Sequence, residues 1–445
     1  MNRTDTIAAI ATAPVRAAIG VVRVSGPDLQ RFAEALTGRR LFARQATLAA
    51  FQDAGGAVLD RGIALFFPAP RSYTGDDVLE LQAHGGPVVL RMLLERCIEL
   101  GARIAEPGEF THRAFLNGKL DLVQAEGVID LIDAGTAQAA RGAMRSLSGE
   151  FSARIQSLST SLVELRALVE AALDFPEEEI DVLDRVDARV RLERLREALA
   201  AVLEAAKQGS LLRDGLYIVF AGQPNVGKSS LLNRLAGEER AIVTDIPGTT
   251  RDPIRELLDI GGIPVHVVDT AGLREASDHV ERIGIERAWA AIGHADVVVL
   301  IADASADAGS TDEALARGFP VGVPRIHVKN KIDLVGRDPG IEETESGAVV
   351  WLSAKTGAGV EHFRTAVLKV AGWHEGGEAV FLARARHLHA LQVAAGHLQA
   401  AALQIGPELL AEELRLAHQA LMTITGEFSA DELLGEIFQR FCIGK

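Results

Sequence analysis

The stretch Gly222-Gln-Pro-Asn-Val-Gly227-Lys228-Ser229 decides how the central part of this sequence folds. It fits the pattern G-x-x-x-x-G-K-S, and a short apolar run, Leu216 to Gly222, leads into it. An apolar strand before such a loop and a helix after it are typical of a phosphate-binding loop. There, backbone N–H groups of the loop and of the helix N-terminus surround phosphate oxygens. This stretch therefore predicts an α/β domain that binds a nucleotide.

Two side chains at the end of this loop suit a nucleoside triphosphate. Lys228 is predicted to pair with the β- and γ-phosphates, and Ser229 to offer its hydroxyl to Mg²⁺. One isolated match of this kind could also be a glycine turn that binds no ligand. The motifs that follow decide between this interpretation and a nucleotide site. The residues predicted to contact the nucleotide here are Asn225, Val226, Gly227, Lys228, Ser229 and Ser230.

Three further motifs follow apolar runs in the order expected for a guanine site. In Asp269-Thr270-Ala271-Gly272, the Asp can hold Mg²⁺ through water and the Gly can meet the γ-phosphate. In Asn330-Lys331-Ile-Asp333, the carboxylate of the last residue suits the N1–H and the exocyclic amine of guanine, two donors that adenine does not present together. Ser353-Ala354-Lys355 can donate backbone N–H groups to the guanine O6. Because parallel sheets bind ligands at the carboxyl ends of their strands, we predict GTP rather than ATP.

Two positions depart from the pattern of a Ras-like GTPase. Leu273 follows Gly272 where many GTPases place the glutamine that orients the attacking water. Leucine cannot do this, so another group must hold that water. Asn225 inside the phosphate loop, with the downstream segment 248–252, indicates a site for a second cation. A monovalent ion there could take the place of an arginine finger.

The nucleotide motifs lie in a segment that alternates short apolar runs with helical sequence. Runs without strong period-two alternation are typical of strands buried on both faces of a parallel sheet. The predicted strands are 216–222, 265–269, 297–302, 325–328 and 349–352. Helical patterns cover about 120–213 and 383–441, so we predict that the α/β domain is inserted into a helical domain.

The first part of the chain mixes β-like runs with Gly and Pro and predicts an α+β domain. Strands are predicted at 18–24, 62–67 and 78–83, and one clear helix at 88–100. The predicted domains are 1–118 (α+β), 119–213 (helical, first part), 214–376 (inserted GTPase domain) and 377–445 (helical, second part).

Composition limits the function classes. Lys+Arg 46 against Asp+Glu 61 gives a net charge of -15, which argues against bulk electrostatic binding of nucleic acid but leaves room for a local basic patch. Cys97 and Cys442 are the only cysteines in the sequence, so we expect a reducing compartment and no disulfide framework. The apolar start, 7–15, lacks the basic residues of a signal peptide, and no stretch of about 18 apolar residues predicts a membrane helix. We expect a cytoplasmic protein.

Along essentially the whole chain, the sequence resembles the tRNA-modification GTPases of the MnmE or TrmE family. The GTPase motifs alone also fit GTPases of ribosome assembly. More specific segments are Ser72-Tyr-Thr-Gly-Asp-Asp-Val-Leu-Glu80, Pro107-Gly-Glu-Phe-Thr-His-Arg-Ala-Phe-Leu-Asn-Gly-Lys119 and the terminal Phe441-Cys-Ile-Gly-Lys445.

The resemblance implies a function and partners. The family makes 5-carboxymethylaminomethyl or aminomethyl groups on the wobble uridine of certain tRNAs, jointly with a flavin-dependent protein, MnmG or GidA, that carries the FAD. Its N-terminal domain is folate-binding-like, takes a tetrahydrofolate one-carbon donor (5-formyl- or methylene-tetrahydrofolate), and forms a homodimer. A heterotetramer with the flavoprotein is therefore implied.

The resemblance also implies which residues bind the cations, the catalytic water and the folate. K⁺ would be held by Asn225, Thr244, Ile246 and Thr249, and Mg²⁺ by Ser229 and Thr250. Glu281 would organise the catalytic water. Folate contacts would come from Arg23, Glu80, Lys119 and Lys445, and Cys442 is a candidate reactive thiol. The family's second GTP-binding segment corresponds to Thr244, Asp245, Ile246, Pro247, Gly248, Thr249 and Thr250.

Several of these residues also have an interpretation that involves no function. Taken alone, Glu281 fits a solvated carboxylate on a charged helix, and Arg23, Glu80 and Lys119 fit surface charges. Cys442 fits a small buried hydrophobe. For the whole chain, the alternatives are a ribosome-assembly GTPase that binds rRNA and a folate-binding methyltransferase that acts without the flavoprotein.

Overall fold

The computed structural model describes residues 5–174, 187–238, 255–269, 295–306, 322–345, 347–373, 380–404, 406–427, 431–439, 441 and 444. The chain divides into two compact units. One combines Met1–Ile129 with Met422–Lys445, and the other is Asp130–Leu421. The three boundaries between the four predicted domains stay predictions.

The first unit is built on a six-stranded sheet with the strand order β3-β4-β5-β2-β1-β6. All neighbouring strands are antiparallel except β1 and β6, which are parallel. The strands are β1 (Ile7–Ile10), β2 (Ile19–Gly26), β3 (Thr47–Gln52), β4 (Val58–Phe67), β5 (Asp77–His84) and β6 (Arg103–Ile104). The helices are α1 (Leu29–Thr37), α2 (Pro87–Glu99), α3 (Glu109–Leu116), α15 (Asp431–Gln439) and most of α4 (Leu122–Asp133).

The helices α1 and α2 cover one face of this sheet. Leu36 of α1 and Leu93 of α2 are fully buried in one cluster with Leu79 and Leu81 of β5. Fully burying one such side chain contributes about 1.5–3 kcal/mol. On a separate cluster, Phe110 of α3 packs with residues of β1. The α+β prediction is confirmed, because strands and helices share these cores.

The predicted strands at 18–24, 62–67 and 78–83 correspond to β2, β4 and β5, and the predicted helix at 88–100 corresponds to α2. The sequence predicts one clear helix in this region, whereas the structure also has α1 and α3. Both are short, and neither has a side-chain hydrogen bond at its N-cap, Asp28 or Gly108. With 9 and 8 residues, each shows its apolar period over only about two turns.

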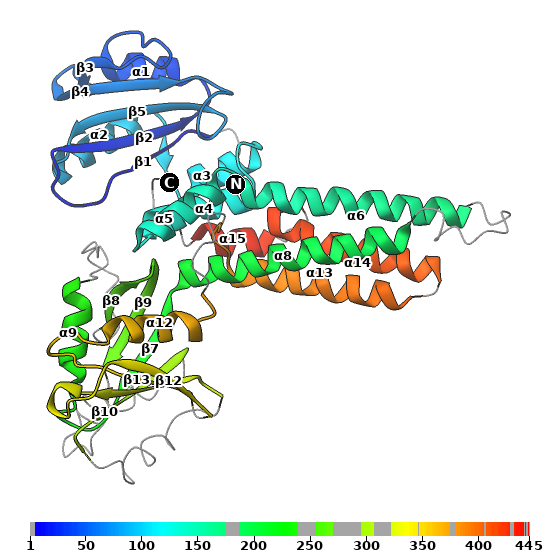
Figure 1. Ribbon diagram of the computed structural model, residues 1–445. Helices are drawn as coiled ribbons and strands as arrows, with labels where there is room; N and C mark the ends of the chain where they lie inside the picture. The colour runs from blue at the N-terminus through cyan, green and yellow to red at the C-terminus, as the bar shows by residue number, and fades with distance from the viewer. Residues whose placement is uncertain are drawn as a thin grey trace, which may run out of the picture. The chain divides into compact units, whose positions relative to one another are not determined.

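The second unit contains a group of helices and a seven-stranded sheet. The helices are α5 (Ala137–Leu147), α6 (Glu150–Asp174), α8 (Ala188–Asp214), α13 (Ala385–Leu403) and α14 (Pro407–Thr425). The long helices α6, α8, α13 and α14 run side by side (Figure 1). His418 of α14 lies 2.9 Å from the Ser159 hydroxyl of α6, and Phe151 stacks on Phe381 at 4.2 Å between ring centroids.

The seven-stranded sheet has the order β12-β13-β11-β10-β7-β9-β8. Its strands are β7 (Leu216–Ala221), β8 (Arg255–Ile260), β9 (Ile263–Asp269), β10 (Val297–Asp303), β11 (Arg325–Asn330), β12 (Gly340–Thr344) and β13 (Gly347–Trp351). Its helices are α9 (Lys228–Glu238), the 3₁₀ turn η1 (Ile332–Leu334) and α12 (Val360–Val370). The five strands predicted from apolar runs form the parallel core, which confirms that prediction. The two strands that were not predicted, β8 and β12, are antiparallel edges.

One carboxylate joins both ends of the inserted α/β segment. Asp130 Oδ1 accepts from Arg213 Nε at 3.0 Å and from Arg384 Nη2 at 2.7 Å. Arg213 lies in the last turn of α8, just before β7, and Arg384 is the N-cap of α13, just after the segment. The returning chain passes α8 so closely that a Cβ on Gly209 would lie 1.9 Å from the Phe381 carbonyl oxygen. The entry and exit of the α/β segment are therefore adjacent, as an insertion requires.

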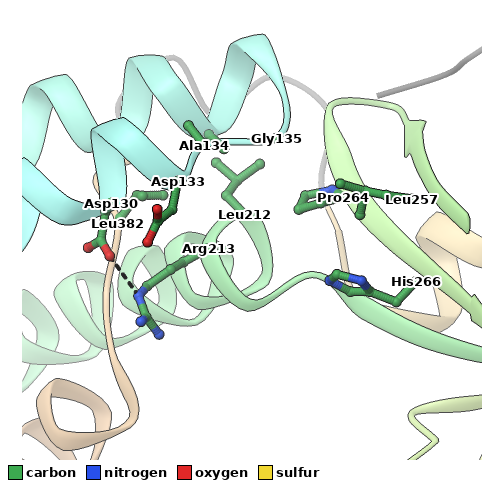
Figure 2. A pocket seen from close by; sticks show the side chains of 11 residues that line it. Asp130, Asp133, Ala134, Gly135, Leu212, Arg213, Leu257, Pro264, His266 and Leu382 are labelled. Carbon is green, nitrogen blue, oxygen red and sulfur yellow. Dashed lines mark hydrogen bonds and ion pairs between the residues drawn. The ribbon is translucent and has the colours of Figure 1, made fainter. Parts of the chain in front are cut away.

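A cavity of about 240 Å³ lies beside this junction (Figure 2). Asp130, Arg213 and Leu212 line it from the helices, and Pro264 and His266 line it from β9. His266 is paired in register with Tyr217, near the start of β7. The phosphate loop follows the other end of β7, so this cavity is separate from the predicted nucleotide site.

Candidate functional site

The phosphate loop lies between the end of β7 and Lys228, the first residue of α9. Gly222 and Gly227 have positive φ angles of 155° and 98°, and Asn225 has a φ of 63°. A Cβ on Gly222 would lie 2.2 Å from the Ile301 carbonyl oxygen, and one on Gly227 would lie 2.2 Å from the side-chain nitrogen of Asn330. Both glycines are thus required by the backbone conformation and by close neighbours.

The predicted phosphate-binding side chains lie around this loop. Lys228 Nζ donates to the carbonyl oxygens of Gly222 at 2.7 Å and Gln223 at 3.0 Å, which places its charge over the loop. Ser229 and Ser230 are exposed in the first turn of α9. The partial positive charge of a helix N-terminus adds to that of the lysine. The loop can therefore take phosphate oxygens.

Asn330 connects three parts of the site. Its side-chain Nδ2 donates to the Val226 carbonyl oxygen in the phosphate loop at 2.7 Å. Its Oδ1 accepts from the Ala354 N–H at 2.9 Å. Asn330 is 2% exposed. Since buried amides that satisfy both ends are held rigidly, Asn330 fixes the phosphate loop and the two predicted guanine segments relative to one another.

The predicted guanine-binding carboxylate is also held in place. Ser353, which is fully buried, donates its hydroxyl to Asp333 Oδ1 at 2.6 Å. On the other side of the segment, Arg234 of α9 donates to the Lys355 carbonyl oxygen at 2.6 Å. The segment 353–355 is thus tied to both α9 and the guanine motif. This leaves the second oxygen of Asp333 for a ligand donor.

Lys331 makes a contact that the sequence analysis did not predict. Its Nζ donates to Asp303 Oδ2 at 2.7 Å. Asp303 ends β10 and is paired in register with Asn330 at the end of β11. The hydrogen bond from Lys331, followed by those from Ser305, lowers the pKa of Asp303 to about 2. No sequence motif marks Asp303, because the contact depends on the pairing of two strands.

The motifs gather at one edge of the sheet, because the parallel strands β7, β9, β10, β11 and β13 all end there. Asp269 is the last residue of β9 and is paired in register with Phe220 of β7, next to the phosphate loop. The arrangement is that of a ligand site at the carboxyl ends of parallel strands.

Several predicted residues lie outside the described residues. They belong to the second GTP-binding segment, the segment after β9 and the end of the chain. They are Thr244, Asp245, Ile246, Pro247, Gly248, Thr249, Thr250, Thr270, Ala271, Gly272, Leu273, Glu281, Cys442 and Lys445.

Two of the predicted cation ligands lie among the described residues. Asn225 and Ser229 offer an amide and a hydroxyl oxygen, the donors that hard cations prefer, at an exposed loop and helix N-terminus. The other predicted ligands fall in the segments just named. Within the described ranges, no three His, Cys, Asp or Glu side chains gather in a way that could hold a metal ion.

In the first unit, two predicted folate-binding residues lie side by side. Arg23 of β2 and Glu80 of β5 are paired in register, and Arg23 Nε donates to Glu80 Oε1 at 3.0 Å. The guanidinium carbon of Arg23 lies 5.5 Å from the Tyr73 ring centroid and 5.8 Å from that of Phe110. Lys119 donates to the Pro70 carbonyl oxygen at 3.0 Å. The two rings were not predicted as site residues, although Tyr73 and Phe110 lie in two of the three family-specific segments.

Gly444, near the end of the chain, also lies beside Arg23. Arg23 Nη1 donates to the Gly444 carbonyl oxygen at 3.3 Å. A Cβ on Gly444 would lie 2.6 Å from the carbonyl oxygen of Ile10 in β1. The backbone at Gly444 therefore contacts the sheet beside Arg23.

A charged network holds the second family-specific segment against the sheet. Arg113 Nη2 donates to Asp5 Oδ1 at 2.7 Å and to Glu109 Oε1 at 3.0 Å, and Arg103 Nη1 donates to Glu109 Oε2 at 2.8 Å. Glu109 is 1% exposed. Burial raises its pKa, but hydrogen bonds from Arg103, Glu106 N–H and Arg113 outweigh burial and hold the pKa below its ordinary value.

Two further observations concern Cys97 and the helices. Cys97 is fully buried, and burial raises the pKa of its thiol to about 12, so it is an unreactive core residue. None of the helices in the described part of the chain has a stretch that is both long and apolar enough to span a bilayer.

Comparisons with known proteins cover the whole chain. The family "GTP-binding protein TrmE N-terminus" matches residues 6–119, and the family "MnmE helical domain" matches residues 122–442. The tRNA modification GTPase MnmE of Azoarcus sp. (strain BH72) is 60% identical over 443 residues, which cover 99% of this chain and 98% of the relative. That of Dechloromonas aromatica (strain RCB) is 56% identical over 448 residues, which cover 100% of both chains.

Solved structures match part of the chain. Aquifex aeolicus Era bound to GDP and aluminium fluoride is 27% identical, with 43% of this chain and 69% of that chain covered and a TM-score of 0.28. The G domain of the T. maritima FeoB iron transporter is 26% identical, with 35% and 98% covered and a TM-score of 0.26. Given the two family matches and the relatives that align over nearly the full length of both chains, this chain belongs to the MnmE family of tRNA modification GTPases.

Proposed function

We propose that this protein is a potassium-stimulated GTPase that acts in tRNA modification. Together with the flavin-dependent MnmG/GidA protein, it adds a carboxymethylaminomethyl or aminomethyl group to C5 of the wobble uridine of certain tRNAs. The GTP part is supported by the Asn330 side chain, which joins the phosphate loop to the guanine segments. The tRNA part is supported by the full-length likeness to tRNA modification GTPases.

The hydrolysis step transfers the γ-phosphoryl group of GTP to water. The water oxygen bonds to phosphorus, the bond to the β–γ bridging oxygen breaks, and GDP leaves. Negative charge spreads over the γ-phosphoryl oxygens in the transition state, so positive charge placed there lowers the barrier. Lys228 supplies one such charge from the first residue of α9.

Two cations complete the proposed site. Ser229, Thr250 and, through water, Asp269 would hold Mg²⁺, which neutralises phosphate charge when bound. Asn225, Thr244, Ile246 and Thr249 would hold K⁺ in the role of an arginine finger. Because Leu273 cannot orient water, Glu281 takes that role in the proposal.

The first unit is proposed to bind a tetrahydrofolate derivative as the one-carbon donor and to form the homodimer. The chemistry at Arg23 supports this, because a guanidinium, the Glu80 carboxylate and the Tyr73 and Phe110 rings suit a polar aromatic ligand such as a pteridine. Lys119 and Lys445 are proposed to join them, and Cys442 is proposed as a reactive thiol. The protein is proposed to work in the cytoplasm in a heterotetramer with the flavoprotein.

The test is nucleoside analysis of bulk tRNA from a strain that lacks this gene. The expected result is loss of the modified wobble uridine, with recovery when the intact gene is returned. Unchanged wobble uridines together with altered ribosomal subunit profiles would favour a ribosome-assembly GTPase. Recovery in a strain that also lacks the flavoprotein would favour a folate-dependent methyltransferase that acts alone.

A further inference from the structure

The Asp303 carboxylate is fixed by its own strand end, independently of Lys331. Its Oδ1 accepts from the Ser305 N–H at 2.9 Å and from the Ser305 hydroxyl at 2.7 Å. Its side chain is 20% exposed. The other oxygen, Oδ2, points to Lys331 Nζ. Two hydrogen bonds to one oxygen leave the second oxygen in a defined position, so Asp303 is an anchor rather than a mobile surface charge.

Lys331 is the side chain that this anchor restrains. It stands between Asn330, which holds the phosphate loop, and Asp333, which is predicted to bind the guanine edge. Its backbone is in the left-handed region, with φ 67° and ψ 36°, and it caps the turn η1. With its ammonium on Asp303, the aliphatic stem has one end fixed by the backbone and the other by an ion pair. A lysine stem can cover the face of a planar base, and its ammonium adds attraction to the π system.

A free lysine has many rotamers, and binding a ligand against it would cost the entropy of ordering it. If that ordering is already present in the free protein, the ligand binds more tightly. We propose that Asp303 is a positioning residue for the guanine base, which acts by holding Lys331 extended along the nucleotide site before GTP or GDP binds. Asp303 itself does not contact the nucleotide in this proposal.

The ordinary alternative is a structural ion pair at the end of two strands, which would affect folding and not affinity. The depressed pKa of Asp303 keeps it charged at neutral pH, so both roles are compatible with its charge. The positioning role and the structural role differ in which measured quantity they change. A positioning role alters nucleotide affinity and KM, whereas a structural role alters the unfolding temperature.

The sheet offers a matched control. Asp296 stands just before β10, at the opposite end of the strand that Asp303 ends, and its Oδ2 accepts from the Tyr217 N–H at 2.8 Å. Asp296→Asn makes the same chemical change as Asp303→Asn and also affects a carboxylate hydrogen bond to the end of a strand. Asp296 lies at the end of the sheet opposite to the nucleotide motifs. The Asp296→Asn variant therefore shows what removing a carboxylate does to the domain, apart from any effect on the nucleotide site.

The experiment measures the affinity of the full chain for GDP, and KM and kcat for GTP, in Asp303→Asn, Asp296→Asn, Lys331→Ala and the double variant of Asp303 and Lys331. We expect Asp303→Asn to raise the Kd for GDP and the KM for GTP about tenfold, the size of one charge-assisted hydrogen bond that orders a binding side chain. We expect kcat to stay within about twofold, because the γ-phosphate lies at the other end of the nucleotide. Asp296→Asn should leave both affinities unchanged.

The double variant decides whether Asp303 acts through Lys331. In the Lys331→Ala background, Asp303→Asn should add less than about twofold to the Kd for GDP, since the side chain that it positions is gone. A full tenfold effect in that background would overturn the proposal. So would an unchanged Kd in Asp303→Asn with a lowered unfolding temperature. GDP binding needs neither tRNA nor the flavoprotein, so this test fails or succeeds separately from the proposed tRNA modification.

Discussion

The side-chain amide of Asn330 donates to the Val226 carbonyl oxygen at 2.7 Å, which joins the end of β11 to the phosphate loop across the sheet. The same side chain accepts from Ala354 N–H at 2.9 Å. One buried residue therefore sets the spacing between the parts of the site that are predicted to contact phosphate and base. Nucleotide affinity should depend on this spacing more than on any single contact with the ligand.

Asn330→Ala removes both hydrogen bonds. Each buried partner left unpaired costs about 1–3 kcal/mol, so we expect the Kd for GDP to rise at least ~100-fold and the unfolding temperature to fall. Fluorescent-nucleotide titration and thermal unfolding check this. Asn233→Ala, at an exposed position on α9, is the control and should change neither. A wild-type Kd in Asn330→Ala would mean that the phosphate loop holds its conformation without this bridge.

Potassium should control the rate of GTP hydrolysis. Because an arginine finger contributes ~10³–10⁵ in rate, replacing K⁺ with Na⁺ at constant ionic strength should slow turnover by orders of magnitude if K⁺ takes that role. Asn225→Gly tests the ligand, since glycine keeps the positive φ of 63° while the amide is lost. This variant should hydrolyse GTP at a similarly low rate in both salts. Equal rates of the unchanged protein in K⁺ and Na⁺ would refute the cation role.

Glu281→Ala should bind GTP with unchanged affinity and lose turnover, because it removes the group proposed to orient water and no group that binds the nucleotide. Single-turnover hydrolysis and nucleotide titration separate the two effects. Glu197→Ala, on the exposed surface of α8, is a matched control that should keep full activity. If Glu281→Ala turned over GTP normally, Glu281 would be a surface charge.

Asp130→Ala should destabilise the junction where the α/β segment enters and leaves the helices. Asp130 is 8% exposed and binds both Arg213 and Arg384. Removing one member of a buried ion pair costs about 3–5 kcal/mol. We expect faster hydrogen exchange at the N-terminus of α13 and the C-terminus of α8. Asp214→Ala is the control, because Asp214 is exposed and also contacts Arg213, and it should cost under ~1 kcal/mol.

The network around Glu109 should make the first unit sensitive to acid. The pKa of Glu109 in the folded protein lies below its ordinary value of 4.5, so the folded state binds a proton less readily than the unfolded state. The stability that this difference contributes is present above pH 4.5 and is lost as the pH falls through the folded pKa. Hydrogen exchange of the α3 amides should therefore speed up below about pH 4.5, beyond the trend of exchange chemistry.

Glu109→Gln should remove most of that dependence on pH while lowering protection at neutral pH. Glu99→Gln, at a side chain that is 58% exposed, should leave both unchanged. An identical acid response in Glu109→Gln would locate the titrating group elsewhere, with Asp5 the next candidate because its pKa is also lowered.

Much of the second unit could be read from the sequence. The runs at 216–222 and 297–302 lack alternation because both faces of β7 and β10 are buried, and burial on both faces is what a run of Val, Ile and Leu records. The edge strands β8 and β12 were missed, since an edge strand is half exposed and its sequence resembles a loop. The helices α1 and α3 were missed because they have 9 and 8 residues, too few to show a clear apolar period, whereas α2 has 13.

The candidate site, like the fold, has features that the sequence predicted and features that it did not. The sequence alone predicted which chemistry to expect: glycines and Lys228 for phosphate, Asp333 for guanine, and Leu273 where a water-orienting glutamine is absent. These predictions follow from residue type and from spacing along one segment, so they require no knowledge of contacts between distant parts of the chain. Only the tertiary structure decided that Asp303 meets Lys331, that Tyr73 and Phe110 flank Arg23, and that Asp130 joins both ends of the inserted segment. Such contacts join residues far apart in the chain, and their partners are chosen by strand order and helix packing, which no local pattern encodes.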